Sequence, residues 1–387
     1  MQDIHIDRGD GNRQRQMNYD YAQSKLCQPS AMPGFLHHNT DRFDGRRVDW
    51  TIRDYDFYGA SYTILSAIAT GGVNMVVCDV PARDLGEFAA FPQTAADNRT
   101  VSVDFYRSWF AFAEEHKQHL LRTKFLPQPP APGAIDGTYA MLNGSGFLFL
   151  FNPNAEAAAT PDGLLTASAA SLDTTCAPGD SLAVGELWPY PSDGALFTVA
   201  CGANFSVALD GRSARVLTIG PAAAAGRQRL APPRAAPLFR HNQPVAGMAH
   251  NTSFSGGRLA GTVRVPQAVF DQLAARTASY PVPWTADDLA VAWMNPSRLL
   301  ASIDVNRAVT SKAVITATLD GAAVPVLPCW SCRSGKSEMC FQGFFIDLSA
   351  AGVAPDTDHA LVVTLPSMAT GAFGGVYYDN VDTIEAP

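Results

Sequence analysis

The chain has 387 residues, which at roughly 100–200 residues per domain corresponds to two to four domains and excludes a single small fold. Hydrophobic residues make up 47% of the chain and charged residues 17%, which excludes an intrinsically disordered protein and a charged coiled coil. The net charge is -8 and there is no run of Lys or Arg, so a nucleic-acid partner is not expected. The 31 Gly and 27 Pro residues predict many turns and much β-structure.

The first region, residues 1–126, has the pattern of an α/β fold. Apolar side chains at helical spacing predict a helix over residues 55–70, and Gly71-Gly72 follows as a stop signal. The continuous apolar run at residues 73–80 predicts a buried parallel strand. Residues 102–122 carry a clear apolar stripe and predict a second helix. Helix, strand, loop and helix in this order form part of an α/β unit.

After a Pro-rich segment the pattern changes to short strands. Residues 127–220 predict an antiparallel β-sandwich, in which Asn143-Gly144 is a strong hairpin signal. An Ala- and Pro-rich linker over residues 221–247 leads to a second, jelly-roll-like sandwich over residues 248–387. Within the second sandwich we expect strands at 259–265, 313–319, 343–348, 360–365 and 376–378, and helices at 269–275 and after Thr285.

Titratable side chains are dense in the first ninety residues. The set comprises Asp7, Asp10, His37, His38, Asp41, Asp54, Asp56, Asp79, Arg83 and Asp84. Paired carboxylates suit glycoside hydrolysis, in which one acts as nucleophile or base and the other protonates the leaving oxygen. The competing interpretation of each aspartate is a helix cap or a solvated turn residue.

Three short motifs resemble a known family. The run His37-His38-Asn39-Thr40-Asp41, followed by Tyr58-Gly59-Ala60-Ser61 and Leu65-Ser66-Ala67, resembles the S-D-N-T-D, Y-G-T-S and L-S-A stretches of family 36 glycoside hydrolases, the α-galactosidases. The resemblance covers about residues 1–220. It implies the C-terminal part of a catalytic (β/α)8 barrel followed by two antiparallel β-sandwiches, an architecture of mixed α/β and all-β domains.

The resemblance also implies roles for individual residues. His38 stands where the family has its acid/base aspartate, and Asp41 matches the second aspartate of the motif, so Asp41, or else His38, is the expected proton donor. The expected substrate-binding residues are Asp7, Asp10, Asp54, Asp56, Asp79 and Arg83. The family's nucleophile lies upstream of the turn at residues 7–13. We therefore expect a longer polypeptide, or a partner chain, to complete the barrel.

Two functions fit these observations. One is a retaining glycoside hydrolase that acts on an α-galactoside-like oligosaccharide or glycoconjugate. The other is a non-catalytic carbohydrate-binding or structural surface glycoprotein, which His38 at the acid position favours. No cofactor is expected.

The cysteines bear on metal binding, and the glycosylation motifs bear on the cellular compartment of the protein. Cys329, Cys332 and Cys340 provide one ligand too few for a four-cysteine zinc site, so no metal is expected; a disulfide with a spare thiol, or three reduced cysteines, is the alternative. Four Asn-x-Ser/Thr motifs favour the secretory pathway without showing it. No apolar stretch of about 18 residues is present, so no membrane span is expected.

Overall fold

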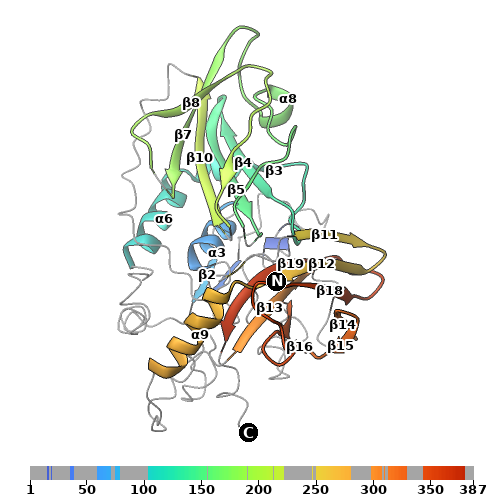
Figure 1. The fold of residues 1–387 in the computed structure, drawn as a ribbon. Helices are drawn as coiled ribbons and strands as arrows, with labels where there is room; N and C mark the ends of the chain where they lie inside the picture. Colours follow the sequence, from blue (N-terminus) through green and yellow to red (C-terminus); the bar gives the residue numbers. More distant parts are fainter. Residues whose placement is uncertain are drawn as a thin grey trace.

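The computed structural model describes residues 15–16, 19, 35–38, 59–70, 75–78, 103–154, 156–189, 191–211, 213–221, 246, 250–279, 298–306, 309, 313–328 and 343–379. This part of the chain is mostly β-strand, arranged in several antiparallel sheets with few helices (Figure 1). The expected helix after Thr285 lies outside the described residues, as do Cys329, Cys332 and Cys340.

A small α/β unit comes first in the chain. Strand β1 (Phe35–His38) pairs in parallel with β2 (Met75–Cys78), and helix α3 (Gly59–Ile68) lies between them in sequence and contacts β1. The predicted strand and helix are therefore confirmed. A (β/α)8 barrel, however, is not evident, since β1 and β2 are the one parallel pair among the described residues.

The predicted long helix is divided in two. Helix α6 (Val103–Glu115) and helix α7 (Lys117–Leu120) are separated by His116, whose φ of -105° and ψ of 19° depart from helical geometry. Both helices bury apolar side chains, such as Trp109, Phe112 and Leu120, in one core with α3.

A six-stranded antiparallel sheet follows in the order β3-β4-β5-β10-β7-β8. Its strands are β3 (Thr123–Phe125), β4 (Asp136–Leu142), β5 (Ser145–Asn152), β7 (Ser181–Trp188), β8 (Ala195–Ala200) and β10 (Ser213–Pro221). The hairpin between β4 and β5 turns at Asn143 and Gly144, with φ of 53° and 80°, which confirms the prediction.

Both faces of this sheet are covered. Phe147, Phe149 and Phe151 of β5 face the core that contains the three helices. Leu148 and Leu150, between them in sequence, face a second core. That core is closed by loops, by helix α8 (Ala169–Leu172) and by the short pair β6 (Ala158–Ala159) and β9 (Ala208–Leu209). One face of the expected sandwich is thus covered by helices, because the strands are apolar on both sides.

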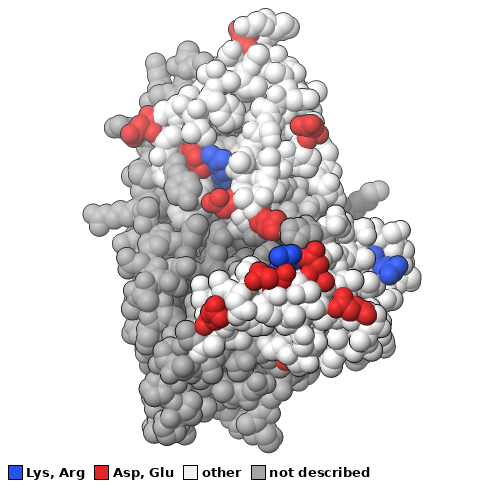
Figure 2. Space-filling view, viewed as in Figure 1, with Lys and Arg blue, Asp and Glu red and all other residues white. Residues whose placement is uncertain are grey.

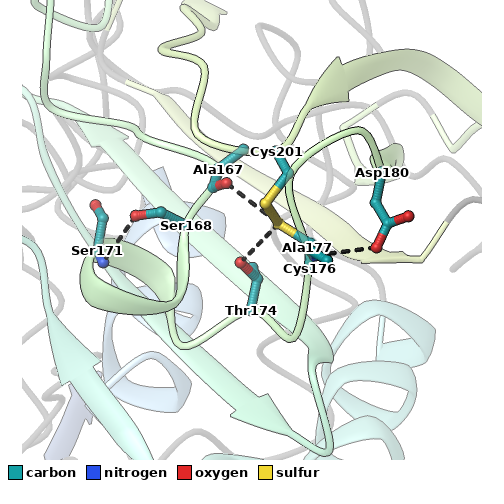
Figure 3. The surroundings of a disulfide bond; sticks show 8 residues. All are labelled: Ala167, Ser168, Ser171, Thr174, Cys176, Ala177, Asp180 and Cys201. Atoms are coloured by element: carbon teal, nitrogen blue, oxygen red, sulfur yellow. Dashed lines mark hydrogen bonds between the residues drawn. A yellow bond between two sulfur atoms is a disulfide. The ribbon is translucent and has the colours of Figure 1, made fainter.

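A disulfide joins the segment between α8 and β7 to the residue that follows β8 (Figure 3). Cys176 and Cys201 are joined with their Cα atoms 5.8 Å apart, and they are separated by 25 residues in sequence. The backbone N–H of Cys201 donates to the carbonyl of Asp180 at 2.9 Å, next to the start of β7. Closing a loop of this length stabilises a fold by about 3 kcal/mol through the entropy of the unfolded chain.

The C-terminal unit is all-β and has two antiparallel sheets that share one core. One sheet has the order β11-β12-β18-β14-β15 and the other β16-β17-β13-β19. The strands are β11 (His250–Ser255), β12 (Arg258–Arg264), β13 (Arg298–Val305), β14 (Thr316–Leu319), β15 (Ala322–Val324), β16 (Val326–Pro328), β17 (Gly343–Asp347), β18 (Asp358–Thr364) and β19 (Gly371–Asp379). Helix α9 (Gln267–Ser279) follows β12 and confirms the predicted short helix. Val263, Ile303 and Leu361, from three different strands, are fully buried in the core between the sheets.

Among the described residues, no helix has the length and apolar character needed to span a membrane.

Candidate functional site

The carboxyl ends of β1 and β2 lie together at one edge of the parallel pair. In the strand register His38, the last residue of β1, is opposite Cys78, the last residue of β2. Asp41 follows His38 by three residues in sequence, and Asp79 follows Cys78 directly. In α/β proteins this edge is where loops carry binding and catalytic side chains. The edge is therefore the candidate active site.

The structure places one of the predicted site residues. His38 is located by its backbone at this edge. The others, Asp7, Asp10, Asp41, Asp54, Asp56, Asp79 and Arg83, lie outside the described residues, so their roles stay predictions.

Helix α3 contacts β1 and carries the motif Leu65-Ser66-Ala67. These three side chains are at most 2% exposed. Because consecutive helical residues point in different directions, this part of the helix is buried on several sides. Tyr62, one turn earlier, makes an edge-to-face contact with Phe151 of the six-stranded sheet at a centroid distance of 5.1 Å. The hydroxyl of Thr70 donates to the carbonyl of Ala67 at 2.7 Å and closes the end of the helix. The motif therefore fixes the position of the α/β unit on the sheet.

A buried ion pair lies next to this contact. Arg15 Nε donates to Asp136 Oδ1 at 2.5 Å, and both side chains are fully buried. Nη2 is equally close to that oxygen but lacks hydrogen-bond geometry. The guanidinium also lies 3.7 Å from the ring centroid of Phe151. Burial raises the pKa of Asp136, and the charge and hydrogen bond of Arg15 partly oppose that rise.

The pair joins two residues that are far apart in the chain. Arg15 follows the Gly-rich turn at residues 7–13 by two positions, and Asp136 is the first residue of β4. Neither residue was predicted from the sequence. A lone Arg in a polar stretch and an Asp at the end of a Pro-rich segment carry no pattern that pairs them across 121 residues.

Other charged side chains make structural ion pairs and hydrogen bonds within the six-stranded unit and the C-terminal unit. Arg215 holds both carboxylate oxygens of Glu186 at 2.8 Å and donates to the carbonyl of Ala208 at 2.7 Å. His359 Nε2 accepts the backbone N–H of Ala354 at 3.1 Å, which leaves Nδ1–H to donate to Asp320 at 2.6 Å. Both ring nitrogens of His359 are therefore occupied, and this Asp–His pair has no free base for catalysis. Within the described residues no group of three or more His, Cys, Asp or Glu could hold a metal ion.

The chain has only distant similarity to known proteins. No protein-family model and no curated protein matches the chain. Among solved structures, an isomalto-dextranase of Arthrobacter globiformis T6 in complex with panose aligns over 89% of this chain, at 11% identity and a TM-score of 0.26. BuGH86 in complex with neoagarooctaose aligns over 64% at 9% identity and a TM-score of 0.18. A β-porphyranase of glycoside hydrolase family 86 from the human gut bacterium Bacteroides plebeius aligns over 64% at 11% identity and a TM-score of 0.17.

These likenesses are distant. This chain spans 48% of the isomalto-dextranase and 33% and 37% of the two others. All three are carbohydrate-active proteins by name or bound sugar, but at such TM-scores the likeness assigns neither a family nor an activity to this chain. Membership of family 36 is not shown.

Proposed function

We propose that this chain is part of a carbohydrate-active protein, a glycoside hydrolase that acts on α-galactoside-like substrates. The observation that supports the proposal is the common edge of β1 and β2, because His38 lies there and the sequence runs directly from both strand ends toward Asp41 and Asp79. The same edge carries catalytic side chains in enzymes with parallel α/β sheets.

The proposed chemistry needs a proton donor for the leaving sugar oxygen. Asp41 is the proposed donor, with Asp79 and Arg83 as ligands of the sugar hydroxyls. Such a carboxyl must stay protonated near the working pH, which burial or a neighbouring carboxylate achieves by raising its pKa. In a retaining enzyme a second carboxylate acts as nucleophile. The resemblance assigns no residue of this chain to that step.

Asp41→Asn tests the proposed donor. With nitrophenyl α- and β-glycosides as substrates, we expect turnover to fall roughly 100-fold or more, because an amide cannot supply the proton. Asp162→Asn, the same change at an exposed loop position, is the matched control and should leave the rate unchanged. A near-normal rate for Asp41→Asn would remove this residue from the mechanism. An absence of turnover with every glycoside would overturn the hydrolase proposal.

A second candidate is a non-catalytic carbohydrate-binding glycoprotein with the same fold. His38, at the position where the resembled family has its acid/base aspartate, favours it. The two candidates differ in one measurable respect, because the second predicts binding of glycans without any hydrolysis.

A further inference from the structure

A groove of about 510 Å³ lies between the six-stranded unit and the C-terminal sandwich. One wall is formed by residues 132–134 and by Asn154 with residues 156–158; the other is formed by residues 252–254 and 371–373. This volume falls in the range of about 300–1,000 Å³ that is typical of small-molecule sites. None of the described residues that line the groove belongs to β1 or β2, the two strands of the candidate active site.

The fold explains why a groove forms here. Asp136 pairs with Phe151, so β4 begins and β5 ends at the same end of the six-stranded sheet. The segments that flank these two strands therefore lie together, and β11 of the sandwich lies beside them (Figure 1). The two units meet at Gly133, where a Cβ atom would lie 3.3 Å from the Cβ of Ala372.

Two phenylalanine rings line the sandwich side of the groove. Phe254 on β11 is 38% exposed and is one of five exposed large apolar side chains among the described residues. Phe373 on β19 lies over Gly261, where a Cβ atom would be 2.6 Å from the ring. A glycine at position 261 therefore leaves the space that the Phe373 ring occupies. The C–H face of a pyranose ring can stack on such surfaces in the way other apolar groups pack on aromatic rings.

The polar atoms in the groove are mainly oxygens. Asn154 donates its amide to Asn152 at 2.8 Å, which leaves its own Oδ1 as an acceptor. Glu156 is exposed, and its carboxylate has no ion-pair partner in the described part of the chain. Thr252 and Ser253 add two exposed hydroxyls. These groups match the hydroxyls of a sugar as donors and acceptors.

The described charge of the groove disfavours an anionic ligand. Its described lining contains Glu156 and no Lys, Arg or His. On the face shown in Figure 2, acidic side chains lie on both β-rich units while basic side chains are sparse. A phosphorylated or nucleic-acid ligand would meet repulsion without a compensating cation.

We propose that this groove binds a neutral oligosaccharide, at a subsite distinct from the β1–β2 edge. The choice of ligand class rests on the proposed carbohydrate function; the location of the subsite rests on the groove itself. An extended peptide added to the edge strand β11 is the other occupant that this geometry allows, and the test below distinguishes the two.

Binding of maltotetraose, cellotetraose and α-1,6-galactobiose to the full chain, measured by calorimetry and saturation-transfer NMR, tests the proposal. We expect at least one of them to bind. Phe254→Ala should weaken that binding roughly fivefold to tenfold, in line with the contribution of an aromatic contact. Phe254→Tyr keeps the ring and should preserve binding. Met368→Ala, which truncates an 83% exposed apolar side chain outside the groove, is the matched control.

The outcomes separate this inference from the proposed hydrolase. Three outcomes would each overturn the proposed subsite. They are the absence of binding by all three sugars, an equal affinity of Phe254→Ala and Met368→Ala for the sugar, and binding of an extended polyvaline–threonine peptide in place of the sugars. Turnover of nitrophenyl glycosides, measured on the same samples, reports on the β1–β2 edge. Sugar binding without turnover would support the subsite and contradict the proposed hydrolase. Turnover without sugar binding at the groove would support the hydrolase and contradict the subsite.

Discussion

Arg15 and Lys124 each hold an aspartate at 2.5 Å, but in opposite surroundings. The Arg15–Asp136 pair is fully buried, whereas the side chains of Lys124 and Asp173 are 57% and 38% exposed. An exposed pair contributes little because water and salt screen its charges. A buried pair is different, since removal of one partner leaves the other charge unpaired in a poor solvent.

Arg15→Met should therefore lower the free energy of unfolding by about 3–5 kcal/mol, because Asp136 would stay buried without its cation. The double variant Arg15→Met/Asp136→Leu should recover much of that loss. Lys124→Met, the exposed counterpart, should cost less than about 1 kcal/mol. Urea denaturation of the variants measures these differences, and equal losses for Arg15→Met and Lys124→Met would contradict the burial argument.

His116 couples stability to pH. Its ring lies 4.8 Å from the rings of both Phe112 and Phe147, and its Nε2 has no hydrogen-bond partner. Burial lowers the pKa of His116, opposed in part by Glu115, and burial also lowers the pKa of His119, with His116 and Arg122 adding to that shift. Since both rings are more easily protonated in the unfolded chain, they contribute stability that is complete above about pH 6.5 and is lost as the pH falls.

We expect the free energy of unfolding to decrease between pH 7 and pH 5, by at most about 1.4 kcal/mol per pH unit for each proton taken up. His116→Phe fills a similar volume without a titratable group, so this variant should show a shallower pH dependence. Thermal unfolding at a series of pH values gives the slopes. An unchanged slope in His116→Phe would assign the effect to other groups.

At the scale of elements, the β4–β5 hairpin depends on one glycine. Gly144 has a φ of +80°, and a Cβ atom there would lie 2.9 Å from the backbone nitrogen of Thr175. Gly163 has a nearly identical φ of +78° but nothing within 4 Å of its Cβ position. Alanine would be strained by the positive φ at both positions, but it would clash with a neighbouring residue only at position 144.

Gly163→Ala should therefore cost about 1 kcal/mol, the strain of the left-handed conformation alone. Gly144→Ala should cost clearly more, about 2–4 kcal/mol, because Thr175 and its backbone must also move. Chemical denaturation of the two variants compares them directly. If Gly144→Ala lowers the free energy of unfolding no more than Gly163→Ala does, the turn can accommodate a Cβ atom without displacing Thr175.

Elements with a continuous or periodic apolar pattern could be predicted from the sequence, whereas strands whose apolar pattern is interrupted by buried charged or polar residues were missed in two cases. The runs that became β2, β5 and β12 show that pattern. Strand β7 was missed because Glu186 interrupts its apolar run, and the partner that allows its burial, Arg215, is 29 residues away. Strand β13 was missed for the same reason, since its buried Ser302 and Asp304 look like loop residues in the sequence. Burial of these groups depends on tertiary partners.

The site followed the same rule. The strand that became β2, and Asp79 after it, could be read along the chain. Strand β1 was not predicted, and its parallel pairing with β2 is known only from the structure. Arg15, Asp136 and the interdomain groove depend on contacts between distant segments, such as Gly133 with Ala372. No local periodicity encodes such contacts.

At the scale of the whole molecule, the cores differ in how they are assembled. The core of the C-terminal sandwich draws its buried and partly buried residues from positions 246–376 alone. The core under the six-stranded sheet combines β5 with α3 and α6 from earlier in the chain, and with Leu300 and Phe345 from the sandwich. We therefore propose that residues 248–387 form an autonomous folding unit, whereas residues 127–221 need the helices that precede them.

Expression of the two fragments separately tests this proposal. Residues 248–387 should give a cooperative melting transition, because their main core stays intact and only contacts at its margin, such as those of Leu300 and Phe345, are lost. Residues 127–221 should aggregate, because the face bearing Phe147, Phe149 and Phe151 loses its cover of helices. Exposure of three such rings forfeits on the order of 10 kcal/mol, comparable to the net stability of a whole domain. Light scattering and calorimetry measure the state of each fragment. A monomeric 127–221 fragment that melts cooperatively would show that the sheet does not depend on the helices. An unfolded 248–387 fragment would show that the sandwich relies on contacts outside its own core.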